Sequence, residues 1–147
     1  MALTIQRVQC TDLPDFWSGF EMLFQEFGGR LRDLSDLRHL FIAIMKGDWD
    51  LWVLADGFDV KVALLASWNV HSKDRLYHIN WIGGERGFKT FRFIEEALET
   101  IEKYALAFGA ADVVLFGREG WGRVLAPYGY MKTGAIFEKP VRKMKGH

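Results

Sequence analysis

The longest amphipathic run in the chain lies between Gly83 and Gly109, where apolar residues recur every three or four positions. This spacing predicts an α-helix whose buried stripe consists of Phe91, Ile94, Leu98, Ile101, Ala105 and Phe108. The solvent-facing side is expected to carry the charged residues Glu95, Glu96, Glu99, Glu102 and Lys103. Thr90 is a suitable N-cap, and Gly109 suits the left-handed residue just past the helix end.

Two strand-like runs flank this helix, residues 76–82 before it and residues 112–116 after it. A strand, a helix and a second strand in succession form a crossover unit, in which the two strands are parallel or nearly so. Such a unit points the positive end of its helix at whatever binds above the sheet. The sequence therefore predicts a ligand site near residues 83–92.

The rest of the chain predicts further strands and helices on either side of this unit. Strands are expected over 3–8, 50–55, 60–70 and 130–139, and helices over 16–27, 34–45 and 121–128. Asp56 and Gly57 indicate a hairpin turn with a loop longer than two residues. The order β-α-α-β-β-β-α-β-α-β predicts one α+β domain over residues 1–147, with a mixed sheet, helices on both faces and a basic tail from about 141.

Composition narrows the functional classes. Half of the 147 residues are hydrophobic, and 19 basic residues balance 19 acidic ones. A compact globule is expected, and the balanced charge argues against a general nucleic-acid or acidic-membrane binder. No run approaches the roughly 20 apolar residues of a membrane span, which predicts a soluble, cytoplasmic protein. Cys10 is the only cysteine and is expected to be a buried small residue.

No residue pattern indicates a metal site or a serine nucleophile. His71 and His78 flank one predicted hairpin, but no HExxH motif and no carboxylate pattern accompany them. Ser67 lacks the G-x-S-x-G setting of a nucleophile elbow. Both histidines are interpreted as structural, and no metal is expected.

The segment 117–139, GREGWGRVLAPYGYMKTGAIFEK, resembles the closing segment of the GNAT family of N-acetyltransferases. That segment has a turn after the fifth strand, a short helix, a Gly-aromatic pair and a last strand, and Gly129-Tyr130 stands at the pair. The GR-x-GW wording is also similar to small GNAT-like proteins encoded among phage and prophage virion genes. The resemblance implies a GNAT fold over nearly the whole chain.

The resemblance also implies an acetyl-CoA site at the start of the central helix. The family's loop, Arg/Gln-x-x-Gly-x-Gly/Ala, falls on Lys89 to Ile94, where Arg92 and Ile94 replace the small residues, so the loop is degenerate. An alternative cradle uses upstream glycines and basic side chains. The candidate cofactor-binding residues are Gly83, Gly84, Arg86, Gly87, Lys89, Thr90 and Arg92; the alternative interpretation of the basic ones is solvated surface charge.

Catalytic candidates follow from the same resemblance. Many family members protonate the leaving thiolate with a Tyr four residues before the Gly-aromatic pair, and Leu125 stands there. Tyr128 is the substitute proton donor. Glu85 is the candidate general base, or alternatively an exposed turn carboxylate. Trp121, between glycines and arginines, is the candidate aromatic residue for a ligand or partner.

Two functions from different classes remain open. One is an N-acetyltransferase that uses acetyl-CoA and a small-molecule or protein amine acceptor. The other is a non-catalytic phage or prophage protein, virion-associated, that uses the same fold for assembly with virion components or with itself.

Overall fold

The computed structural model describes residues 3–26, 37–69, 74–85, 93–116, 125–132 and 136–141. The backbone divides into two compact units, Met1–Ala66 with Trp81–Thr90, and Ser67–Asn80 with Phe91–His147. Strands β3 and β4 each contribute residues to both units.

The described strands form one mixed sheet in the order β1-β2-β3-β4-β5-β7-β6. Strand β4 pairs parallel with β5, whereas β1–β2, β2–β3, β5–β7 and β6–β7 are antiparallel. The strands are β1 Thr4–Arg7, β2 Asp50–Asp56, β3 Asp59–Asn69, β4 Leu76–Gly84, β5 Asp112–Phe116, β6 Met131–Lys132 and β7 Ile136–Lys139. The predicted α+β class and the mixed sheet are confirmed.

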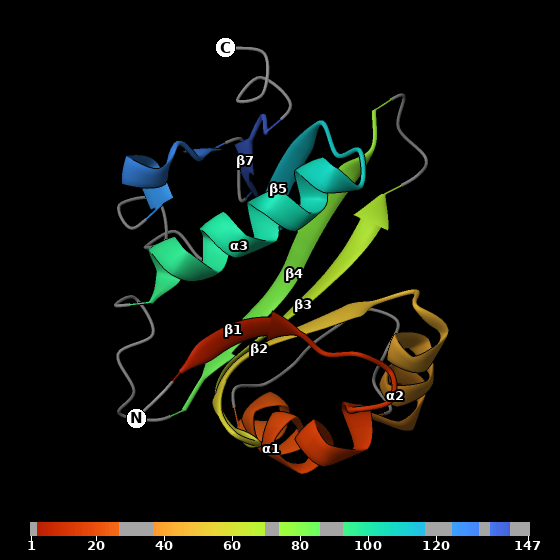
Figure 1. Cartoon of the computed structure of the whole chain (residues 1–147). Coiled ribbons are helices and arrows are strands. Elements are labelled where there is room, and N and C mark those ends of the chain that lie inside the picture. Colours follow the sequence, from red (N-terminus) through yellow and green to blue (C-terminus); the bar gives the residue numbers. More distant parts are fainter. Residues whose placement is uncertain are drawn as a thin grey trace. The chain divides into compact units, whose positions relative to one another are not determined.

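The first unit has its core between two helices and the β1–β2–β3 strands. Helices α1 (Leu13–Glu26) and α2 (Leu37–Lys46) pack together against these strands (Figure 1). Alternate residues of a strand point to the same face, and the strand residues in this core are Leu51, Val53, Ala55, Val60, Ala63 and Leu65. The helices contribute apolar residues at helical spacing, namely Leu13, Phe16, Phe20, Leu23, Phe24, Leu40 and Ile44.

The β2–β3 hairpin is tighter than the sequence indicated. Asp56 pairs with Asp59, so the loop contains only Gly57 and Phe58. Gly57 has φ +61°, and a glycine with positive φ at the first loop position is the pattern of a type II′ turn, which matches strand twist. The expectation of a longer loop was wrong. The register then shifts between Leu54 and Ala55, which leaves Lys61 as the extra residue of a β-bulge.

In the second unit, α3 (Ile94–Ala107) packs on β4, where the rings of Tyr104 and Tyr77 lie 5.6 Å apart, and Figure 1 shows the helix crossing this strand. The helix ends as the sequence predicted, because Gly109 has φ +91° and its N–H donates to the Leu106 carbonyl (3.1 Å). The Ala110 N–H donates to the Ala105 carbonyl (2.9 Å), which completes a Schellman motif. Phe108, predicted to be buried, is 56% exposed, because it lies at the cap, beyond the regular helical turn.

The C-terminal segment contains two strands where one was predicted. Met131 pairs with Glu138 and Lys132 with Phe137 in antiparallel register, so the chain reverses between Lys132 and Ile136. The prediction of a single strand over 130–139 was wrong, because β6 and β7 pair with each other in antiparallel register. Before β6, the short helix appears as the 3-10 turn η2 (Ala126–Tyr128), while residues 121–124 lie outside the described ranges.

Cys10 is exposed and its thiol donates to the Met45 carbonyl (3.3 Å), so the prediction of a buried cysteine was wrong. The thiol lies after β1, where the chain has left the sheet. Among the described residues, no helix is long and apolar enough to cross a membrane.

Candidate functional site

The parallel strands β4 and β5 form the part of the second unit most suited to a ligand. Their pairing runs from Leu76–Asp112 to Ile79–Leu115, and α3 connects them. In sheets of this kind, ligands bind beyond the carboxyl ends of parallel strands, close to the start of the connecting helix. The sequence prediction of a crossover unit is therefore confirmed, and Ile79 and Leu115 are the last paired residues of its two strands towards their carboxyl ends.

The start of α3 has no side-chain cap. Phe93 is the N-cap residue, and its ring cannot accept a hydrogen bond from the first-turn amides. An uncapped helix N-terminus suits an anion such as a phosphate. The exposed first-turn residues Glu95 and Glu96 favour the helix dipole but repel a diphosphate. An anion here therefore needs basic groups from neighbouring residues.

Most of the predicted cofactor-binding residues lie outside the described ranges, namely Arg86, Gly87, Lys89, Thr90 and Arg92. Gly83 and Gly84 end β4 in the first unit. A Cβ on Gly83 would collide with the six-membered ring of Trp81, whose indole packs against Phe24 (ring centroids 5.2 Å apart). Packing therefore explains the glycine at 83, and the cofactor role of both glycines stays a prediction.

Glu85 is an exposed carboxylate in an ion pair. Its Oε2 lies 3.0 Å from Lys61 Nζ, and its N–H donates to the Lys61 carbonyl (2.7 Å). Lys61 Nζ also lies 2.9 Å from Asp59 Oδ2. Hydrogen bonds to Asp59 and then to Glu85 raise the pKa of Lys61. The pair anchors the end of β4 to the bulge in β3, so Glu85 has a structural role, and its role as a base stays a prediction.

The predicted proton donor Tyr128 is the last residue of η2 and is half-buried. Gly129 follows it with φ +87°, and its N–H donates to the Ala126 carbonyl (3.1 Å). Leu125, at the position of the family acid, is fully buried. Trp121 lies outside the described ranges. Tyr128 is therefore the described residue of this turn with an acidic proton and partial access to solvent.

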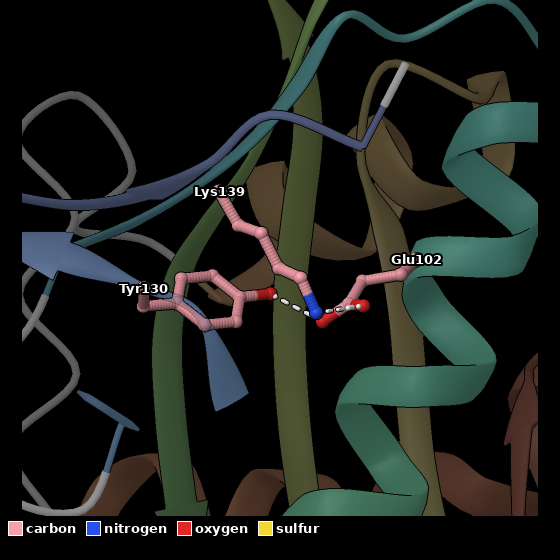
Figure 2. Close-up of polar contacts among 3 residues, drawn as sticks. All are labelled: Glu102, Tyr130 and Lys139. Atoms are coloured by element: carbon pink, nitrogen blue, oxygen red, sulfur yellow. Dashed lines mark hydrogen bonds and ion pairs between the residues drawn. The ribbon is translucent and has the colours of Figure 1, made fainter. Parts of the chain in front are cut away.

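A buried polar cluster lies between α3 and the C-terminal strands (Figure 2), and we call Glu102, Tyr130 and Lys139 the Glu102 cluster. The Tyr130 hydroxyl donates to Glu102 Oε2 (2.9 Å), and Lys139 Nζ lies 2.9 Å from Glu102 Oε1. Glu102 is 5% exposed and Tyr130 4%. Each carboxylate oxygen therefore has a donor, as a buried charge requires.

The electrostatics of this cluster keep Tyr130 protonated. Burial first, and then the Glu102 carboxylate as neighbour and hydrogen-bond acceptor, raise the pKa of Tyr130 well above its ordinary value. Tyr130 is consequently a hydrogen-bond donor and a poor source of protons. The cluster fixes the C-terminal strands to α3 and is not itself suited to acid–base chemistry.

The sequence interpretation missed Glu102, which it placed on the solvent-facing side of the helix. Glu102 follows the buried Leu98 by slightly more than one turn and precedes the buried Ala105 by slightly less than one. Residues at those spacings share a helix face. The signal was therefore present in the spacing, but the charge of the side chain outweighed it.

A second polar group lies on β3 and β4 in the second unit. Asn80 Nδ2 donates to Ser67 Oγ (2.9 Å), and Asn80 follows His78 on the same face of β4. Partial burial lowers the pKa of His78, so its imidazole is neutral near pH 7. Within the described ranges no group of three or more His, Cys, Asp or Glu side chains could hold a metal ion.

Comparison with known proteins shows that this chain resembles several solved structures in its fold. No model of a known protein family matches the chain, and no curated protein matches it in sequence. An aminoglycoside acetyltransferase from an uncultured soil metagenomic sample, solved with sisomicin, matches with TM-score 0.65 and 15% identity, over 86% of this chain and 84% of its own.

Two other matches extend over more of the chain. A chain of the NatC complex, solved with Gag peptide and CoA, has TM-score 0.71 and 8% identity over 95% of this chain and 99% of its own. AtaT, solved with acetyl-methionyl-tRNAfMet, has TM-score 0.64 and 13% identity over 98% of both chains. At these identities the likeness shows that the chain has the fold of these proteins.

Proposed function

We propose that this chain, which has the fold of the GNAT acetyltransferases, is an N-acetyltransferase that uses acetyl-CoA. The observation that carries the proposal is the parallel β4–β5 pair, with α3 connecting its strands and starting without a side-chain cap. This arrangement suits an anionic ligand at the carboxyl ends of the strands. Bound there, acetyl-CoA would supply an activated thioester for direct attack by an amine.

The chain's own residues are assigned to binding and proton transfer. The main-chain amides at the start of α3 and the side chains of Arg86, Lys89 and Arg92 would hold the diphosphate; Thr90 and the glycines at 83, 84 and 87 are the remaining predicted contacts. Positive charge from those side chains would offset Glu95 and Glu96. Tyr128 would hold the proton for the leaving sulfur, and Glu85 is the predicted base.

Binding is tested by calorimetry and thermal unfolding with acetyl-CoA. A ligand at 100 times its dissociation constant stabilises the fold by about 2.7 kcal/mol. We expect the stabilisation to be reduced in Lys89→Ala and Arg92→Ala. Lys103→Ala, an exposed cation farther along α3, is the matched control and should bind as the wild type does. Absence of any stabilisation at millimolar acetyl-CoA would contradict the proposal.

The acceptor is tested by release of free CoA in the presence of amines from three classes: an aminoglycoside, a peptide with a free N-terminus, and an aminoacyl-tRNA. The balanced charge of the chain argued against nucleic acid, but the structural likeness to AtaT, solved with a tRNA, makes the third class a necessary arm. Tyr128→Phe is expected to lower kcat about a hundredfold, as loss of a general acid does.

A second candidate function is a non-catalytic, virion-associated protein encoded by a phage or prophage. The observation that favours it is Leu125, which is apolar and fully buried where the resemblance expects a proton donor. This candidate predicts neither acetyl-CoA binding nor CoA release with any acceptor. Virion genes beside the coding sequence would support it.

A further inference from the structure

The turn that carries Tyr128 is held in place by the Glu102 cluster. Tyr130 follows Tyr128 by two residues, and the Tyr130 hydroxyl donates a hydrogen bond to the buried Glu102 carboxylate. The Tyr130 N–H donates to the Leu125 carbonyl (3.4 Å), which closes the turn from its C-terminal side. Any rotation of the turn that carries Tyr128 would therefore disturb a buried, charge-assisted hydrogen bond.

Lys139 supports the same turn from β7. The open side of Gly129 faces the Lys139 stem, since a Cβ on Gly129 would lie 3.2 Å from Lys139 Cε. Its ammonium is bound to Glu102, so both ends of the Lys139 stem are fixed. Figure 2 shows Lys139 and Tyr130 reaching the Glu102 carboxylate together. Glycine has wide backbone freedom, and the Lys139 stem lies against the backbone of Gly129 on this side.

We infer that the Glu102 cluster sets the orientation of Tyr128, so that Glu102 and Lys139 are positioning residues for the proton donor. The inference rests on the proposed function of Tyr128. When the Lys139 ammonium is removed, the side chain at position 139 is no longer held beside Gly129. Tyr128, which precedes Gly129, then gains conformational freedom. The Tyr128 hydroxyl is then less often in the position from which it can donate a proton to the leaving sulfur.

The orientation is measured without any ligand, by ¹⁹F NMR of protein containing 3-fluorotyrosine. The chain has four tyrosines, and each resonance is assigned with its own Tyr→Phe variant. In Lys139→Met, the resonances of Tyr128 and Tyr130 are expected to shift or broaden. The resonances of Tyr77 and Tyr104, which contact each other in the aromatic cluster between β4 and α3, are expected to stay.

Two variants test whether the ammonium is responsible. Lys139→Arg retains a cation for Glu102 and should return both resonances towards their wild-type positions. Lys103→Met removes the same charge from the exposed neighbour of Glu102 on α3 and should leave all four resonances unchanged. In Lys139→Met, kcat is expected to fall about tenfold with KM for acetyl-CoA unchanged, and the substitution should have no further effect on Tyr128→Phe.

The outcomes separate this inference from the proposed function. If the wild type releases no CoA with any acceptor, the proposed function fails, and the NMR result alone decides whether the cluster orients Tyr128. An unmoved Tyr128 resonance in Lys139→Met, or four resonances that move together, overturns the inference. Full kcat in Lys139→Met, from an active wild type, overturns it as well.

Discussion

At the scale of single residues, Glu102 links α3 to the C-terminal segment through its contacts with Tyr130 and Lys139. It is a carboxylate on the buried face of α3, with one donor for each oxygen. Buried charges are tolerated when they are fully paired, and removing one partner leaves an uncompensated group. Substitutions in this cluster therefore test whether a polar contact, rather than apolar packing, holds the C-terminal strands on α3.

Tyr130→Phe is expected to destabilise the protein by about 1.5–3 kcal/mol, because a hydrogen bond to a charged group has that value. Urea unfolding measures the change. In a Glu102→Gln background the acceptor is no longer charged, so the same substitution should cost clearly less. Equal costs in the two backgrounds would show that Tyr130 contributes through packing and not through its hydroxyl.

At the scale of secondary-structure elements, Gly47 follows helix α2 and Gly129 follows the 3-10 turn η2, both with positive φ. The surroundings of the two glycines differ. Gly47 (φ +83°) follows α2, and a Cβ added there would meet nothing within 4 Å, whereas Gly129 (φ +87°) faces the Lys139 stem. The backbone strain of a substitution is therefore similar at the two positions. The packing cost is different.

Gly47→Ala is expected to cost about 1–2 kcal/mol, the ordinary penalty of a left-handed residue with a Cβ. Gly129→Ala should cost more, since the new methyl group also displaces Lys139 from its place beside Glu102. Thermal unfolding of both variants measures the difference. Equal costs would mean that Lys139 moves away without loss, and that its stem does not hold the turn.

The sequence predicted elements well where spacing and turn residues agree. The bounds 112–116 match β5, and Gly109 ends α3 as expected. The errors arose where a side chain's chemical character and its position disagree: Glu102 is charged but buried, and Phe108 and Cys10 are exposed. The spacing of Glu102 places it on the buried helix face, but it cannot reveal the partners that make the burial of its charge possible, because they are 28 and 37 residues away in the chain.

The candidate site was less predictable than the fold. Tyr128 lies in the C-terminal segment where a short helix was expected, but the N-cap of α3 is Phe93 and not the predicted Thr90. The Glu85–Lys61 ion pair depends on a bulge in β3 that no local pattern indicates. Gly83 looked like a phosphate-facing residue, whereas the indole of Trp81 explains it. The Glu85–Lys61 pair and the packing of Trp81 on Phe24 both depend on contacts between residues far apart in the chain, which a linear pattern does not contain.

At the scale of the whole molecule, the dependence of stability on pH should have an acidic limb that involves His78. Its folded pKa is lowered by burial from an ordinary value of 6.5. The unfolded chain therefore binds a proton first as the pH falls, and stability is lost below about pH 6.5. In His78→Asn, urea midpoints between pH 7 and pH 5 should fall less steeply than in the wild type.

An alkaline limb is expected from Tyr130. Its folded pKa is raised well above 10.0, so the unfolded chain loses the proton first as the pH rises. The stabilisation by protonated Tyr130 is full below pH 10 and is lost above it. Tyr130→Phe should flatten this part of the curve, while Tyr128→Phe serves as the control. A curve that is unchanged in Tyr130→Phe would contradict the assignment.

The strand order leaves β1 and β6 at the two edges of the described sheet. β1 has 4 residues and β6 has 2, whereas cross-β stacking uses runs of about six or seven residues. Neither edge offers such a template, and the longer, more apolar β2 and β3 are paired on both sides. We therefore expect the short outermost strands of the described sheet to protect concentrated solutions of the folded protein from fibril growth.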